Sequence, residues 1–269
     1  MMGRNTHSSK KLHYILNDVC ADRPYSHQGV QLVRVDASKN SGIAGHWTHS
    51  GSGILIEDAS DVRVRYTRTS NNGFACDSGV GGPCGLWAAN SRRVRFEHCV
   101  SSHNRTAGDL DGGGFDFDGG VTDSLIKHCV AHSNMGAGIM LYNYRGAAYP
   151  FGNNLVVNNV CINNGSTTEY GDLHIDGTAA DSAIIDNVVT ACDSASPLLV
   201  IAGTTDGITC TDNVLRSHAS RIAFTITGRH RNLAFARNPV FATGGEPVVV
   251  FLGGALPNAN AFERLWNAR

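Results

Sequence analysis

GGFDFDGG, residues 113–120, contains a short apolar segment that returns at regular intervals along the chain. Gly85 to Gly114 is 29 residues, and Gly114 to Gly138 is 24. The copies of this segment lie at 53–56, 85–88, 114–117, 138–141, 173–175, 199–201, 224–226 and 249–251. Each copy has only three or four residues, which alternate with period two and are followed by turn residues. This pattern predicts short β-strands.

A second apolar segment follows the first in each repeat. Its copies lie at 62–64, 94–96, 125–126, 155–157, 183–185, 208–210 and 233–235. A dipeptide follows in turn: His98-Cys99, His128-Cys129, Asn159-Val160, Asn187-Val188, Asn213-Val214 and Asn238-Pro239. We expect these Asn and His side chains to stack as an internal ladder that satisfies backbone groups at a recurring turn. Repeats of this length, made only of short strands and turns, predict a β-solenoid.

From about residue 32 to residue 251, these repeats resemble right-handed parallel β-helix proteins of the pectate-lyase-like superfamily. The FDFDGG strand followed by a Gly-Ala-Gly coil is most similar to uncharacterised bacterial β-helix repeat proteins. The resemblance implies an all-β, right-handed, single-stranded parallel β-helix and a polysaccharide or oligosaccharide partner. We expect one domain over residues 1–269, with an N-terminal cap or first coil at 1–29, central coils at 30–253 and a C-terminal cap at 254–269. Phe262, Leu265 and Trp266 would lie on one face of a short capping helix.

Composition narrows the function classes. Charged residues make up 17% of the chain, hydrophobic residues 42%, and the formal net charge is −1. These values argue against disorder and against non-specific binding of nucleic acid. No apolar run approaches the ~18 residues of a membrane helix, so we expect no membrane partner. The N-terminal residues of this chain contain no signal-peptide apolar stretch, yet a polysaccharide partner favours an extracellular or cell-surface location in a bacterium. The sequence does not distinguish a monomer from a homotrimer.

The cysteines are of two kinds. Cys99, Cys129 and Cys161 recur in consecutive repeats, and we expect them to point inward as small hydrophobic residues. Cys76 and Cys84 bracket the loop CDSGVGGPC. A disulfide that closes this loop and a pair of free thiols remain open alternatives.

Strand parity assigns the functional face. If Phe115 and Phe117 point into the solenoid, the alternate residues point out. These outward residues are Trp87, Asp116, Asp118, Met140, Tyr142, His174 and Asp176. The longest insertions lie beside the same strands, so we expect loops to wall a groove there.

Carboxylates dominate this face. Asp109, Asp111, Asp116 and Asp118 lie within ten residues, and such crowding raises carboxyl pKa values and suits acid/base chemistry. We predict hydrolysis of a polysaccharide with Asp116, Asp118 and Asp176 as catalytic residues, and His174 positioning or sharing a proton. The predicted substrate-binding residues are Trp87, Tyr142 and Tyr144 for stacking, Arg145 for an acidic sugar, and Asp109 and Asp111.

Other functions remain open. A lyase or uronan epimerase would use Tyr142 or His174 as base, with Arg145 or Ca²⁺ neutralising a uronate. Gly114-Phe-Asp116 looks like the start of the mannuronan epimerase motif, but Phe117 and Asp118 stand where that motif has Pro and His. A non-catalytic glycan-binding or adhesive domain is the third alternative.

Two structural alternatives also remain. No cofactor is required by these residues, although Asp109 and Asp111 are candidate Ca²⁺ ligands. Trp87 and Tyr142 could be covered by their own loops as local core instead of stacking on sugar rings.

Overall fold

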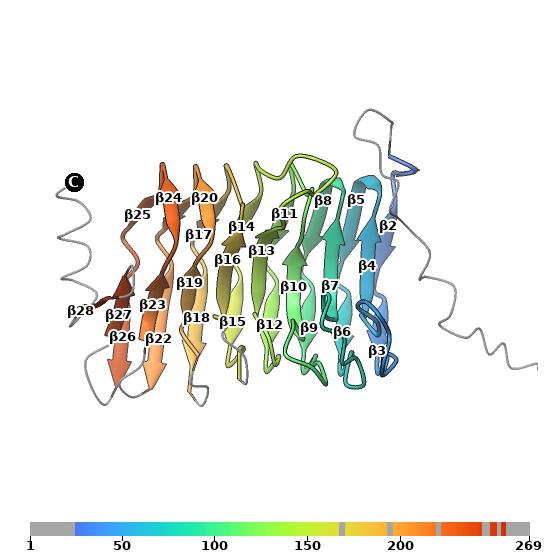
Figure 1. Cartoon of the computed structure of the whole chain (residues 1–269), viewed down its shortest axis with the longest axis horizontal. Helices are drawn as coiled ribbons and strands as arrows, with labels where there is room; N and C mark the ends of the chain where they lie inside the picture. Colours follow the sequence, from blue (N-terminus) through green and yellow to red (C-terminus); the bar gives the residue numbers. More distant parts are fainter. Residues whose placement is uncertain are drawn as a thin grey trace, which may run out of the picture.

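The chain folds into coils that stack in sequence order along one long axis (Figure 1). The computed structural model describes residues 25–166, 170–192, 196–218, 222–243, 248–251 and 254–256. Every named strand pairs in parallel with the equivalent strand of a neighbouring coil, except for one antiparallel pair at the end of the described chain. The architecture is therefore the all-β parallel solenoid that the repeats predicted. In the described part, no helix is long and apolar enough to cross a membrane.

The first sheet is formed by the first apolar segment of each repeat. It contains β4 (Ile54–Glu57), β7 (Cys84–Ala89), β10 (Gly113–Phe117), β13 (Ile139–Asn143), β16 (Leu173–Gly177), β19 (Leu199–Ile201), β23 (Ile222–Ile226) and β27 (Val248–Phe251). At its edge, β28 (Gly254–Leu256) pairs antiparallel with β27. The predicted capping helix, with Phe262, Leu265 and Trp266, lies outside the described residues, as does most of the predicted N-terminal cap.

The second sheet is formed by the second apolar segment. It contains β1 (His27–Gln28), β2 (Gln31–Val33), β5 (Ala59–Arg65), β8 (Arg92–Glu97), β11 (Leu125–Lys127), β14 (Leu155–Val157), β17 (Ala183–Ile185), β21 (Thr209–Thr211) and β25 (Ala234–Ala236). A small additional pair joins β20 (Thr204–Asp206) to β24 (Arg229–Arg231).

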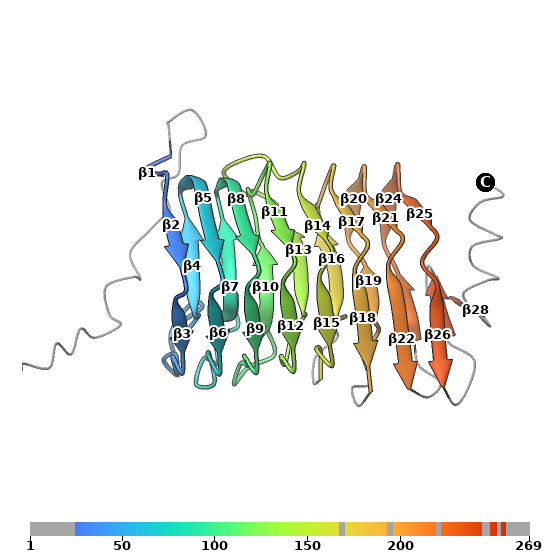
Figure 2. The same ribbon diagram turned by 180° about the vertical axis from the view of Figure 1, so that it is seen from behind.

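A third sheet follows the ladder dipeptides, where the sequence had indicated only a turn. It contains β3 (Asp36–Ser38), β6 (Arg68–Ser70), β9 (Val100–Ser102), β12 (Val130–His132), β15 (Val160–Ile162), β18 (Val188–Ala191), β22 (Val214–His218) and β26 (Val240–Thr243). Figure 2 shows these strands from the opposite side of the molecule. Several are three residues long with polar members, such as VSS in β9, so their apolar alternation is too weak to identify from sequence.

The core runs along the inside of the coils. Phe115 of β10 lies in register between Leu86 of β7 and Ile139 of β13, and all three are buried. Phe117 is also fully buried and contacts Phe96 of the second sheet, with ring centroids 5.3 Å apart. Burying each such side chain stabilises the fold by roughly 1.5–3 kcal/mol. The predicted inward parity of β10 is thus confirmed.

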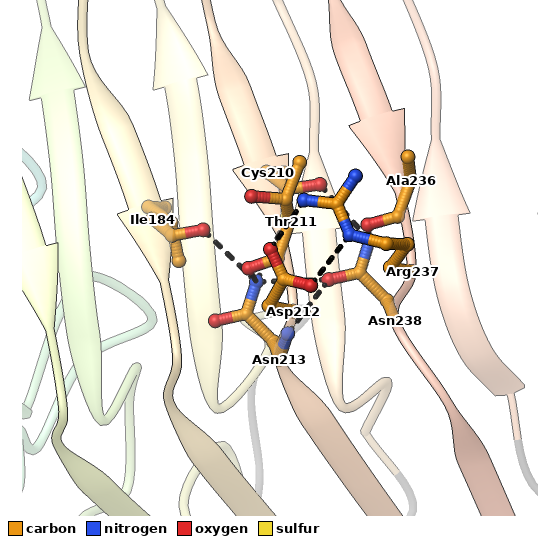
Figure 3. Close-up of polar contacts among 8 residues, drawn as sticks. All are labelled: Ile184, Cys210, Thr211, Asp212, Asn213, Ala236, Arg237 and Asn238. Carbon is orange, nitrogen blue, oxygen red and sulfur yellow. Dashed lines mark hydrogen bonds and ion pairs between the residues drawn. The ribbon is translucent and has the colours of Figure 1, made fainter.

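An asparagine ladder closes the turn between the second and third sheets. Asn187 Nδ2 donates to Asn213 Oδ1 at 2.9 Å, and Asn213 Nδ2 donates to Asn238 Oδ1 at 2.9 Å. Asn213 Nδ2 also lies 2.9 Å from the Ile184 carbonyl oxygen (Figure 3). Each side chain is buried and satisfies backbone groups of the preceding coil, as the sequence predicted for these asparagines.

The two histidines assigned to this ladder lie elsewhere. His98 and His128 have positive φ values of 54° and 55°, which turn their rings to the surface, where they stack at 5.1 Å. Cys99 and Cys129 take the inward places, and the Cys129 N–H donates to Asn159 Oδ1 at 2.8 Å. The prediction that His98 and His128 join the ladder is therefore wrong, because the strand register pairs Val130 with Val160, which places His128 opposite Asn158 and Cys129 opposite the ladder residue Asn159.

A second ladder, not recognised from sequence, leads into the first sheet. Asn72, Asn104, Asn134 and Asn164 are buried, and each Nδ2 donates to the Oδ1 of the next member at 2.8–2.9 Å. Asp172 ends the series by accepting from Asn164 Nδ2 at 2.7 Å. This ladder fixes the entry of the strands that carry the outward carboxylates.

The structure distinguishes a disulfide between Cys76 and Cys84 from a pair of free thiols. Cys76 and Cys84 are both buried and both free thiols, so the disulfide alternative is wrong for this structure. Cys99, Cys129 and Cys161 are also buried, as predicted.

Candidate functional site

The outward residues of the first sheet form two rows that cross the coils. The covered row comprises Leu55, Trp87, Asp116, Met140, His174 and Val200, which are in strand register. The carboxylate row comprises Glu57, Ala89, Asp118, Tyr142 and Asp176, two residues further along each strand. Neighbouring members of a row are ~4.8 Å apart at the backbone.

Loops fold over the covered row. Asp116 is 2% exposed and His174 is 5% exposed, although both side chains point away from the solenoid core. Above them, Asp111 Oδ2 accepts from the Gly82 N–H at 2.6 Å, and Asp111 Oδ1 lies 3.3 Å from Tyr170 Oη. The predicted insertions therefore meet one another above these strands instead of standing apart as the walls of an open groove.

Trp87 is part of this covered layer. Its Nε1 donates to Ser52 Oγ at 3.0 Å, and its ring makes an edge contact with His49 at 4.9 Å. It packs with Cys84, Ala89 and Leu55 in a small apolar cluster separate from the main core. The predicted stacking of Trp87 on a sugar ring is therefore wrong for this structure, and the local-core alternative holds for it.

Asp116 is a buried carboxyl group whose Oδ1 has no hydrogen-bond partner. Burial, reinforced by the nearby Asp118 and Asp111 charges, raises the pKa of Asp116 well above its ordinary value. Both effects favour the protonated form of this carboxyl group.

The position of His174 is fixed by its backbone neighbour. Its Nδ1 accepts from the Gly171 N–H at 3.3 Å, so the proton of the neutral ring is on Nε2. That Nε2 lies 3.6 Å from Asp176 Oδ2. The Tyr170 ring makes a T-shaped contact with the imidazole at 5.1 Å. His174 is thus held under its loop with its proton directed at Asp176.

Asp118 and Asp176 are half-buried in the carboxylate row. Burial raises the pKa of Asp118 to about 7, although the Gly119 N–H that donates to its Oδ1 at 2.6 Å works in the opposite direction. Burial also opposes ionisation of Asp176, but His174 and the Gly177 N–H outweigh it and lower the pKa of Asp176. The two carboxyl groups therefore hold different protonation states near neutral pH.

The predicted aromatic and basic contacts differ in exposure. Tyr142 is half-buried between Asp118 and Asp176, and burial raises the pKa of its phenol. Tyr144 is 37% exposed, and Arg145 is also exposed. These residues, unlike Trp87, are accessible from solvent.

Glu57 is a member of the carboxylate row that the sequence analysis missed. It ends β4, where its register partner is Ala89 of β7. Burial raises its pKa to about 7, opposed by the Asn90 amide and reinforced by Asp58. The alternation of inward and outward residues that places Asp118 on the outer face also places Glu57 there, when it is applied to the ILIE segment of β4.

The predicted calcium ligands Asp109 and Asp111 have different surroundings. Both carboxylate oxygens of Asp111 already face the protein donors Gly82 and Tyr170, and Asp109 is exposed on its loop. Within the residues that the structure describes, no three His, Cys, Asp or Glu side chains are grouped so as to hold a metal ion.

Comparisons with known proteins address the fold. The sequence family described as "Right handed beta helix region" matches residues 24–160, just over half of the chain. Among solved structures, the chain is similar to the catalytic domain of GH87 alpha-1,3-glucanase in complex with nigerose, with 10% sequence identity and a TM-score of 0.29. That similarity covers 82% of this chain and 63% of the glucanase domain, so the chain spans less than two thirds of it. No curated protein matches the sequence.

Proposed function

We propose that this chain, which belongs to the right-handed β-helix family, hydrolyses a polysaccharide at its carboxylate row. The observation that carries the proposal is the placement of Asp118 and Asp176 on either side of Tyr142, in one outward row and with oppositely shifted pKa values. In hydrolytic sites, surroundings that shift two carboxyl pKa values in opposite directions make one carboxyl group the acid and the other the base.

The geometry suits an inverting displacement. Two coils separate the backbones of Asp118 and Asp176 by ~9.6 Å, which is at the upper limit of the ~6.5–9.5 Å found between the carboxyl groups of inverting glycosidases. Asp118 keeps its proton up to about pH 7 and would donate it to the leaving oxygen. Asp176 is ionised and would take a proton from the attacking water.

His174 is a positioning residue in this scheme. Its Nε2 proton faces Asp176 Oδ2, which favours the ionised carboxylate. Asp116 lies in the neighbouring covered row, where burial raises its pKa and favours its protonated form. Tyr142 and Tyr144 would contact the sugar rings, and Arg145 lies on the loop that follows β13.

The lyase alternative has less support. A Tyr142 base would need a lowered phenol pKa, whereas burial and the Asp118 charge raise the pKa of this group. A His174 base is covered by its loop, and its Nδ1 is already occupied by Gly171. The non-catalytic glycan-binding alternative is compatible with the same surface and is separated from hydrolysis by the experiment below.

The test compares wild-type protein with Asp118→Asn and Asp176→Asn on a panel of neutral and acidic polysaccharides, with release of reducing ends as the readout. Each variant should lose activity by at least ~100-fold while binding is retained, because only proton transfer is removed. Asp186→Asn is a matched control, since Asp186 is an exposed residue at the start of the turn between the second and third sheets.

Full activity in both site variants would show that the carboxylate row is not the catalytic site. Binding of a polysaccharide by the wild-type protein without any cleavage would instead favour the glycan-binding function. Products with the absorbance of unsaturated uronates would favour the lyase.

A further inference from the structure

Asn90 is a buried polar residue that the proposed chemistry does not use. It directly follows Ala89 of the carboxylate row, and it is 6% exposed. Its Oδ1 has no hydrogen-bond partner, although burying an unsatisfied amide oxygen is unfavourable. Gly120 leaves the space for this oxygen, because a Cβ at that position would lie 2.7 Å from Asn90 Oδ1. The unpartnered acceptor points to a ligand that supplies a hydrogen-bond donor.

Tyr144 lies next to this acceptor. A Cβ added to Gly119 would lie 2.2 Å from the Tyr144 Cε1 atom, so the ring rests directly on the backbone of Gly119. Tyr144 is 37% exposed and follows the end of β13, so its ring offers a surface to solvent. An aromatic ring beside hydrogen-bonding groups is a common arrangement for binding a ring with an apolar face and polar edges.

Ala89 separates two carboxyl groups at the same place. Glu57 and Asp118 are its neighbours in the carboxylate row, on the coils before and after it. The backbones of Glu57 and Asp118 are two coil spacings, ~9.6 Å, apart. Because Ala89 has only a methyl group, no large side chain of the row stands between the two carboxyl groups. Carboxyl groups in this arrangement accept hydrogen bonds from hydroxyl groups.

We propose that Glu57, Asn90 and Tyr144 form a subsite that binds an uncharged sugar unit beside Asp118. The inference rests on the carbohydrate partner of the proposed function and not on its reaction. Glu57 and Asn90 Oδ1 accept hydrogen bonds from sugar hydroxyl groups, and the Tyr144 ring supports the apolar face of the same sugar.

The charges of the site select a neutral glycan over a uronate. Glu57, Asp118 and Asp176 share one row, and neither this row nor the covered row contains a Lys or Arg in any described coil. Recognition of a uronate carboxylate calls for a paired cation, most often Arg. Arg145 is the candidate cation from sequence, but it is exposed on the loop that follows β13 and is not a member of either row. A polyuronate would therefore meet the ionised Asp176 and no compensating cation within the row.

The test measures binding by affinity gel electrophoresis of the full chain in the Asp118→Asn background, which removes cleavage but leaves the subsite. The probes are a neutral β-glucan, α-glucan, xylan and galactomannan, with polygalacturonate and alginate as the acidic set. Tyr144→Ala and Glu57→Gln should each weaken binding of the preferred neutral polysaccharide by about tenfold. Gly119→Ala should do the same, because the new methyl group displaces the Tyr144 ring.

Two variants serve as matched controls. Tyr66→Ala removes an exposed tyrosine that directly follows β5 of the second sheet and should bind like the parent protein. Glu97→Gln changes a half-buried carboxyl group of β8, in the second sheet, and should also leave binding unchanged. Circular dichroism establishes that each variant is folded.

The subsite is overturned if Tyr144→Ala, Glu57→Gln and Gly119→Ala all bind like the parent protein. Preference for an acidic polysaccharide, or no binding of any neutral one, also overturns it. If the predicted binding losses occur but the wild-type protein cleaves no polysaccharide, the subsite stands and only the proposed hydrolysis fails.

Discussion

At the scale of the residue, burial decides the chemistry of the carboxylate row. Asp118 and Asp176 have the same side chain, yet burial raises the pKa of Asp118 to about 7 while His174 and Gly177 lower the pKa of Asp176. The difference comes from what each carboxyl group contacts, since Asp176 has a proton donor within ion-pair distance and Asp118 has further carboxylates nearby.

This difference predicts the pH dependence of the proposed activity. Asp118 must carry its proton to act as an acid, so the rate should fall as pH rises through about 7. Asp176 must be ionised to act as a base. Because its pKa is lowered, the acidic limb should lie below the ordinary carboxyl pKa of ~3.9. Measurement of kcat/KM across pH 3 to 9 checks both limbs.

A substitution at Glu57 tests whether Asp118 produces the alkaline limb of the pH profile. Its charge contributes to the raised pKa of Asp118. Glu57→Gln removes the charge, so the alkaline limb should move to lower pH. An alkaline limb that stays in place or moves upward would contradict the role given to Asp118.

At the scale of the element, the asparagine ladders join the short strands into coils. Asn187 donates from its side chain to the Val156 carbonyl and to Asn213 Oδ1, and its own Oδ1 accepts from Asn159. A strand of three residues makes few backbone hydrogen bonds to the neighbouring strands. The buried asparagine amides therefore add hydrogen bonds between neighbouring coils at the turns, where strand pairing is interrupted.

Substitution of a ladder asparagine should destabilise the fold more than substitution of an exposed residue. Asn187→Ala leaves buried donors and acceptors of two neighbouring coils unsatisfied and should lower the free energy of unfolding by about 2–3 kcal/mol. Chemical denaturation measures the loss. Arg216→Ala, an exposed change in β22, should cost less than about 0.5 kcal/mol. Equal effects of the two substitutions would show that the ladder is not a principal source of stability.

At the scale of the whole molecule, each coil contacts mainly the coil before it and the coil after it (Figure 1). Stability in such a solenoid is close to a sum of coil and interface terms. Coils in the middle have two neighbours, and the proposed site on β10, β13 and β16 lies there with strands paired on both sides.

Hydrogen exchange should follow this arrangement. Backbone amides of β10 and β13 should be the slowest to exchange, and those of β2 and β3, near one end of the solenoid, should exchange first. Mass-spectrometric exchange on peptides from each coil provides the measurement. A single rate shared by all coils would indicate that the molecule unfolds as one cooperative unit.

Much of the architecture was readable from the sequence because it is local and repeated. The apolar segments gave the strands of two sheets, and alternation correctly placed Phe115 and Phe117 inside and Asp116 and Asp118 on the opposite face. The ladder asparagines from Asn159 to Asn238 were recognised for the same reason, since a residue that recurs at one place in every coil must fill the same role.

Only the tertiary structure decided which outward residues reach solvent. Parity placed Trp87, Asp116 and His174 on the outer face, but contacts between loops distant in sequence, such as Asp111 with Gly82, cover them. The tertiary structure also leaves Cys76 and Cys84 as free thiols. Its strand register places Cys99 and Cys129, and not His98 and His128, in line with the ladder asparagines. A repeating pattern fixes the direction of a side chain along a strand. Its burial, and with it the pKa of a carboxyl group, depends on what the non-repeating loops place above it.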